Sequence, residues 1–123
     1  MVTENVIQKE TKVAAAVINA RRVVIMDTDG KVTEPTSIVD LPFGINERAV
    51  NTDDSASIMP IANGGKAIVQ AGKVLNENDQ VSTDGDGKAI AAASGSYTFG
   101  ICVKAGNTDD LVEIQLSNIA IKA

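Results

Sequence analysis

The feature that most constrains the fold of this chain is an internal duplication. The tripeptide Phe-Gly-Ile at residues 43–45 recurs at residues 99–101. The tetrapeptide Asn-Thr-Asp-Asp at residues 51–54 recurs at residues 107–110, with the same offset of 56. Two unrelated motifs that recur at one spacing indicate that a structural unit was duplicated in tandem.

The duplication extends upstream with an offset that is one residue longer. Residues 27–31 and 84–88 share the pattern Asp-x-Asp-Gly-Lys. When residues 12–33 and 43–58 are aligned with their copies, 17 of 38 positions are identical. The change in length falls between the two blocks, where a surface loop tolerates it.

These boundaries predict the domain organisation. We expect repeats at about residues 12–62 and 69–118, an N-terminal arm at residues 1–12, and a single β domain at residues 13–123.

Each repeat carries the sequence pattern of short strands. At residues 111–117, Val112, Ile114 and Leu116 alternate with polar residues, which is typical of a half-buried strand. The chain contains 14 Val and 13 Ile against 4 Leu, and branched side chains favour sheet over helix. The Asp-Gly pairs at residues 29–30 and 86–87 predict hairpins. We therefore predict an all-β fold with little helix, a small β-barrel or sandwich of two tandem homologous repeats.

Apolar residues that occur in both repeats are expected to have the same packing role in each. The alternation around residues 99–104 places Ile101 on the same face as Phe99. The predicted core anchors are Phe43, Ile45, Ile58, Phe99, Ile101 and Ile114.

The residues that most often carry catalysis are scarce. The absence of histidine excludes Ser-His triads and His-containing zinc sites. Cys102 is the only cysteine, so no internal disulfide forms, and we predict that its thiol is inert. The paired carboxylates at residues 53–54 and 109–110 precede strands and are expected to cap turns. We predict no catalytic residue, no cofactor, no metal and no enzymatic activity.

Two acidic turns resemble the opening of a calcium-binding loop. They lie at residues 27–30 and 84–87. A calcium loop needs a bidentate acid at its twelfth position, which is Ile38 in the first turn and Gly95 in the second. We therefore expect hairpin turns whose aspartates accept backbone N–H groups.

Charge and composition exclude two classes of partner. The net charge of −5 and the sequence pI of about 4.6 disfavour binding to nucleic acid, because an acidic chain repels phosphates. Residues 1–12 are polar and lack the apolar stretch of a signal peptide, and no apolar run is long enough to span a bilayer. We expect synthesis in a cytoplasm, with no membrane partner.

The second repeat also resembles a known family. Its small and aliphatic residues follow the order Val69-Gln70-Ala71-Gly72, Leu75, Asp79, Val81, Asp86-Gly87-Lys88-Ala89, Gly100-Ile101, Val103, Ala105-Gly106 and Val112-Glu113-Ile114-Gln115-Leu116. This order resembles the capsid cement, or head decoration, proteins of tailed bacteriophages, and the resemblance covers about residues 13–117. Asn78 stands where the family pattern has glycine, and asparagine also tolerates a left-handed turn.

The resemblance implies a structural role on the capsid exterior of a virion. Such a protein binds the major capsid protein of an assembled head, stabilises the head by bridging capsomers, and commonly forms a homotrimer. The arm lies outside the duplication, and its proposed shell contacts are Val2, Val6, Ile7, Lys9 and Lys12.

One alternative function stays open at this point. The chain could be a ligand- or carbohydrate-binding β module of a virion or cell-surface fibre. Its only aromatic residues are Phe43, Tyr97 and Phe99, and sugar sites usually stack a ring.

Overall fold

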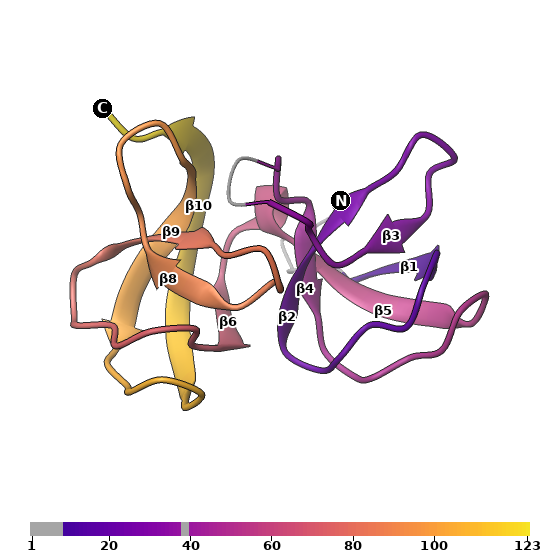
Figure 1. Cartoon of the computed structure of the whole chain (residues 1–123), viewed down its shortest axis with the longest axis horizontal. Helices are drawn as coiled ribbons and strands as arrows, with labels where there is room; N and C mark the ends of the chain where they lie inside the picture. Colours follow the sequence, from indigo (N-terminus) through magenta and orange to yellow (C-terminus); the bar gives the residue numbers. More distant parts are fainter. Residues whose placement is uncertain (1–8, 38–39) are drawn as a thin grey trace, which may run out of the picture.

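The computed structural model describes residues 9–37 and 40–123, and it is all-β, with two five-stranded sheets whose strands pair antiparallel (Figure 1). The first sheet has the order β1-β5-β4-β2-β3 and consists of β1 (Glu10–Val13), β2 (Arg22–Met26), β3 (Val32–Thr33), β4 (Gly44–Asn46) and β5 (Ser55–Pro60). A 3-10 turn, η1 (Ile61–Asn63), follows. The second sheet has the order β6-β10-β9-β7-β8 and consists of β6 (Lys66–Gln70), β7 (Gln80–Thr83), β8 (Ala89–Ala91), β9 (Tyr97–Lys104) and β10 (Leu111–Ile121). Because equivalent strands occupy equivalent places, the predicted fold of two tandem β-repeats is confirmed.

Each sheet curls so that its two edges approach one another. An isolated parallel bridge joins Ala14, directly after β1, to Val32 in β3. The second repeat has the equivalent bridge between Ala71 and Ala89. Curling of this kind leaves less of each sheet edge free to pair with other chains.

The repeated Asn-Thr-Asp-Asp motif forms a turn that is anchored to the chain after the first strand. Asp53 has a φ of 69°. Its N–H donates to the carbonyl of Ala14 at 2.8 Å, and the N–H of Ala14 donates to the carbonyl of Asp54 at 2.9 Å. The second repeat forms the same pair of bonds between Ala71 and the turn at residues 107–110. The acidic pairs therefore serve turns, as predicted.

The glycine of each Phe-Gly-Ile motif allows two strands to approach closely. A Cβ on Gly44 would lie 2.5 Å from Cγ2 of Ile58 and 2.7 Å from the carbonyl oxygen of Met59. A Cβ on Gly100 would lie 2.6 Å from Cγ2 of Ile114. All three distances are too short for a side chain, so the glycines are required by packing.

Two buried clusters form the core. The larger belongs mainly to the second repeat and contains Ala67, Val69, Ala71, Leu75, Val81, Ala89, Phe99, Cys102, Val112, Ile114 and Leu116, joined by Val23, Ile45 and Ile61 of the first repeat. The smaller lies within the first repeat and contains Ala14, Ile18, Val24, Val32, Ala56 and Ile58, with Phe43 and Val50 partly buried against it. The first repeat thus contributes side chains to both clusters.

The two repeats also share polar contacts where β2 lies beside β6 (Figure 1). The N–H of Val23 donates to the carbonyl of Gly87 at 2.7 Å. The guanidinium of Arg22 donates to Oε1 of Gln70 at 3.2 and 3.1 Å, and to the carbonyl of Asp86 at 3.1 Å. These contacts hold the repeats together as neighbours.

Two sequence-based expectations are corrected. β1 begins at Glu10, so residues 10–12 belong to the first sheet and the arm is shorter than predicted. Ile101 is 41% exposed, so the prediction that it is a core anchor is wrong. Ile101 lies opposite Gln115 on β10, whereas Cys102 lies opposite the buried Ile114. Cross-strand partners share a face, so Cys102 takes the inward position.

The other predicted anchors are placed as follows. Ile45, Ile58, Phe99 and Ile114 are buried, and Phe43 is half-buried.

Candidate docking surface

The outward-facing side chains of β6, β9 and β10 form a continuous surface on the second repeat. Glu113 of β10 lies between Ile68 of β6 and Lys104 of β9, and Gln115 lies between Lys66 and Ile101. We call this surface the outer face and define it as Lys66, Ile68, Ile101, Val103, Lys104, Leu111, Glu113 and Gln115.

The outer face is aliphatic at several points and charged between them. Ile68, Ile101, Val103 and Leu111 are all exposed. The ammonium of Lys66 lies 3.9 Å from the carboxylate of Glu113. A shallow hollow of about 150 Å³ is lined by Ile68, Lys104, Leu111, Val112 and Glu113. Exposed aliphatic groups set among charges are typical of a docking surface.

The equivalent position in the first repeat has a different environment. Ile45 is the counterpart of Ile101, but it is only 1% exposed and belongs to the cluster shared with the second repeat. The second repeat therefore covers this position in the first repeat. No described residue covers Ile101 to the same degree.

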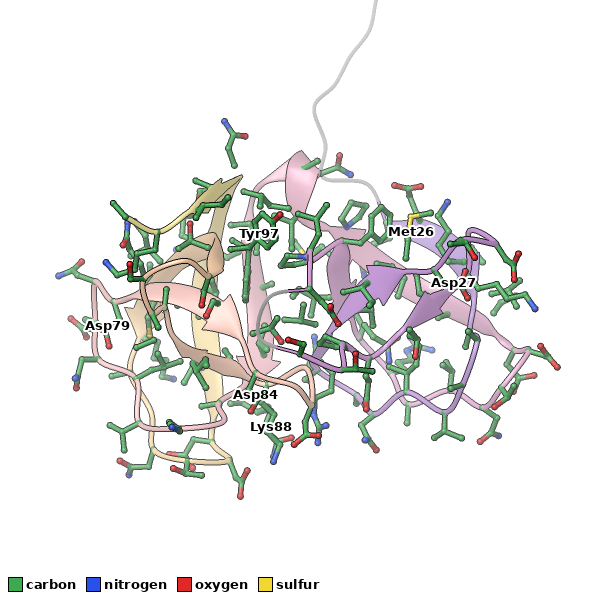
Figure 2. The ribbon with its side chains drawn as sticks, turned by 45° about the horizontal axis from the view of Figure 1, so that its top comes forward. Met26, Asp27, Asp79, Asp84, Lys88 and Tyr97 are labelled. Atoms are coloured by element: carbon green, nitrogen blue, oxygen red, sulfur yellow. The ribbon has the colours of Figure 1, made fainter. Side chains whose placement is uncertain are left out.

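A second apolar hollow lies in the first repeat. It has a volume of about 400 Å³ and is lined by Ile25, Met26, Asp40, Leu41, Pro42 and Phe43. Met26 lies on the upper side of the first repeat in Figure 2. The carboxylate of Asp40 accepts the N–H of Thr36 at 2.9 Å, so this carboxylate is hydrogen-bonded within its own loop. We call this feature the Phe43 hollow.

The predicted shell-contact residues fall into two groups. Lys9 forms an ion pair with Glu47 at 3.0 Å. Lys12 lies 3.8 Å from Glu10, and its ammonium lies 5.8 Å from the centroid of the Phe43 ring. Both lysine charges are therefore engaged within the chain. Val2, Val6 and Ile7 lie outside the described residues.

The acidic turns are hairpin turns, as predicted. Oδ1 of Asp27 accepts the N–H groups of Asp29 and Lys31, both at 2.9 Å, and Asp84 holds the second turn in the same way. Figure 2 shows Asp27 and Asp84 far apart, on different repeats. Within residues 9–37 and 40–123, no three His, Cys, Asp or Glu side chains are grouped so that they could hold a metal. The same part of the chain contains no helix long and apolar enough to cross a membrane.

Cys102 is buried inside the second repeat. Burial raises the pKa of its thiol, and the nearby carboxylates of Asp79 and Glu77 also raise it. Its Sγ donates a hydrogen bond to the carbonyl of Lys104 at 3.3 Å. A raised pKa keeps the sulfur protonated and therefore weakly nucleophilic. Its counterpart Asn46 forms the equivalent hydrogen bond, to the carbonyl two residues on, at 2.6 Å.

Comparison with known proteins identifies a fold. No protein-family model matches the chain, and no curated protein matches it. Its structure is similar to the crystal structure of the head fiber gp8.5 N base in bacteriophage phi29, with a TM-score of 0.73. The match covers 94% of this chain and 98% of that chain, at 19% sequence identity. The chain therefore has the fold of that fiber base.

Proposed function

We propose that this chain is a structural protein of a phage virion, specifically a capsid decoration (cement) protein that binds the outer surface of an assembled head and bridges capsomers. The observation that carries the proposal is the similarity in fold, over almost the whole chain, to the base of a phage head fiber. A second line of support is the order of small and aliphatic residues, which resembles that of cement proteins.

The outer face supports an interfacial role. Its exposed aliphatic side chains would lose water on docking, and Lys66, Lys104 and Glu113 would supply charge complementarity around them. The buried Cys102 supports a role without catalysis. Each contact would be modest, but many copies on one head stabilise it together, because binding to the assembled lattice alone shifts the equilibrium towards that lattice.

We further propose that the outer face contacts a second copy of this chain. Ile45 shows that the corresponding position in the first repeat is buried against a neighbouring repeat. A neighbouring copy could cover Ile101 in the same way, through a head-to-tail contact. Three such contacts would give the homotrimer that the family resemblance implies.

The proposal is tested with purified, expanded heads that lack decoration proteins. We expect saturable binding to these heads and no binding to unassembled capsid protein, as measured by cosedimentation and by quantitative mass spectrometry of copy number. The Ile101→Asp variant should lower the oligomeric state in analytical ultracentrifugation, whereas Val17→Asp, at a position that is also exposed but lies outside the outer face and the Phe43 hollow, should not. Failure to bind any head at saturating concentration would reject the decoration role.

A second candidate is a module of a virion fibre that recognises a ligand or carbohydrate. The observation that favours a fibre is that the similar structure is described as a head fiber base. Glycan-array binding together with no binding to heads would support this candidate over decoration.

A further inference from the structure

A small group of outward-facing residues surrounds a backbone bridge in the first repeat. The bridge joins Ile18 and Val50, and each N–H donates to the carbonyl of the other residue at 3.0 Å. Ile18 is buried, so the residues on either side of the bridge point away from the core. We call these residues the first tip patch and define it as Val17, Asn19, Ala49 and Asn51, all of which are exposed.

The second repeat has the same arrangement around Leu75 and Gly106. The N–H of Leu75 donates to the carbonyl of Gly106 at 2.9 Å, and the N–H of Gly106 donates back at 3.1 Å. Leu75 is buried, and a Cβ on Gly106 would lie 2.7 Å from Cγ1 of the buried Val112. The bridge therefore faces the core here as well. Its outward neighbours are again exposed and form the second tip patch of Val74, Asn76, Ala105 and Asn107.

The outward residues of the two tip patches match, whereas the inward residues differ. All four outward positions carry the same amino acids in both repeats, namely valine, asparagine, alanine and asparagine. The inward pair is Ile18 and Val50 in the first repeat, but Leu75 and Gly106 in the second. Substitutions at exposed positions generally cost little stability. Stability alone therefore does not explain why the outward residues were retained while the supporting pair changed.

Local structure explains the asparagines of the tip patches but not the valines. Asparagine opens the Asn-Thr-Asp-Asp turn in each repeat, a position at which it is favoured. The amide of Asn19 donates to Oε2 of Glu34 at 3.1 Å. Val17 and Val74, in contrast, are 60% and 55% exposed. An aliphatic side chain kept in water at both equivalent positions favours a role in contact with another molecule.

The two tip patches lie on the same side of the molecule. In Figure 1 the loops at residues 14–21 and 47–54 lie on the lower side of the first repeat, and the loops at residues 71–79 and 105–110 lie on the lower side of the second. They remain on the lower side in the rotated view of Figure 2. The repeats share a buried cluster and backbone hydrogen bonds, so the spacing between the patches is fixed.

We propose that the two tip patches bind equivalent sites on two neighbouring subunits of the capsid shell. The inference rests on the proposed decoration role and supplies the contact that bridges the subunits. Two identical patches at a fixed spacing fit two identical sites at a fixed spacing, which an assembled lattice presents and a free subunit does not. Each patch combines an aliphatic group with uncharged amides, so its site on the shell is a neutral, partly apolar surface. Simultaneous binding of both patches turns two weak contacts into a strong one.

The test uses the variants Val17→Asp and Val74→Asp, the double variant, and purified, expanded heads that lack decoration proteins. Each single variant should weaken binding by about 100-fold or more, because the remaining patch binds without the gain from bivalency. The two losses should be similar, and the double variant should show no saturable binding. Cosedimentation over a range of protein concentrations measures these affinities.

The matched control is Ile121→Asp, at a position that is 63% exposed and lies outside both tip patches. This variant should bind heads as tightly as the unmodified chain, and a loss as large as that of the patch variants would overturn the assignment. The urea midpoints of all the variants should match that of the unmodified chain, since the substituted side chains are exposed. Hydrogen exchange of the unmodified chain gives a second readout, because peptides covering residues 14–21 and 71–79 should both gain protection on heads.

Four further results would overturn the proposal. Loss of binding in only one single variant, or protection of only one peptide, would show that one patch acts alone. Normal binding of all the patch variants would exclude the patches from the interface and leave the decoration role in place. A lower oligomeric state of a patch variant in analytical ultracentrifugation would assign the patches to contacts between copies of the chain. If the unmodified chain binds no head, the decoration role fails and the bridging contact fails with it.

Discussion

The two repeats have the same strand order but differ in the side chains that form their cores. The second repeat buries Phe99 completely and has Val69 on β6. The first repeat leaves Phe43 half-buried, and the counterpart of Val69 is Lys12, whose charge lies near the Phe43 ring. The Asp-Gly turns, the Asn-Thr-Asp-Asp turns and the close-approach glycines, in contrast, are the same in both. Duplication therefore preserved what the backbone requires, while the side chains of the core diverged.

The largest expected difference between the repeats is at the two phenylalanines. Phe99→Ala should destabilise the protein by about 3–5 kcal/mol, because it leaves a cavity in the larger cluster. Phe43→Ala should cost roughly half as much, since part of that ring is already in water. Chemical denaturation of both variants measures the difference. Equal losses would mean that the two cores are equivalent after all.

Substitutions of the isoleucines in the two Phe-Gly-Ile motifs should differ almost as much in their effect on the free energy of unfolding. Ile45→Ala removes a side chain buried between the repeats and should cost about 2–5 kcal/mol. Ile101→Ala, at an exposed position, should change the stability of the monomer by less than about 0.5 kcal/mol. Urea unfolding at low protein concentration checks both values. A large loss at Ile101 would contradict its assignment to the outer face.

Substitutions of the glycines in the two Phe-Gly-Ile motifs should destabilise the protein to a similar extent. Gly44→Ala places a methyl group against Ile58 and the backbone of β5, and Gly100→Ala does the same against Ile114 and β10. We expect a destabilisation of about 1–3 kcal/mol for each, because a packed strand pair must separate. Thermal unfolding gives the comparison. If only one variant is destabilised, the close approach is not a shared requirement.

The smallest effect is a pH dependence confined to the second repeat. The pKa of the Cys102 thiol is raised by burial, so the folded state keeps a proton that the unfolded state releases above its ordinary pKa of about 8.5. Its stabilising contribution is complete below that pH and is lost as the pH rises towards the folded value.

The Cys102→Ala variant isolates this contribution. Between pH 8 and pH 10 the unmodified chain should lose more stability than Cys102→Ala does, as measured by urea midpoints. If the urea midpoints of both proteins change with pH in the same way, the thiol does not contribute to the pH dependence of stability.

Most of the fold could be predicted from the repeat pattern, because hairpin turns and strand alternation depend on local chemistry. The hairpins follow from Asp-Gly turns, and the buried set on β10 follows from simple alternation at Val112, Ile114 and Leu116. Alternation did not predict Ile101 correctly, since the inward face of β9 is decided by its partners on β10 rather than by its own sequence. Polar Gln115 was the available signal, because it is the cross-strand partner of Ile101.

The candidate surfaces were harder to predict. Ile68 and Leu111 are aliphatic like core residues, and only the pairing of β6 with β10 places them outside. The Phe43 hollow is lined by residues 25–26 and 40–43, two segments that come together only in the folded chain. Such features arise from tertiary arrangement and leave no periodic signal in the sequence.

The contribution of Val23, Ile45 and Ile61 to a cluster built mainly by the second repeat has a consequence for synthesis on the ribosome. The first repeat emerges before the residues that cover these side chains have been made. At typical elongation rates this interval lasts on the order of seconds, during which these apolar side chains are exposed to solvent. Complete folding of the first repeat therefore depends on the second repeat, which is translated after it.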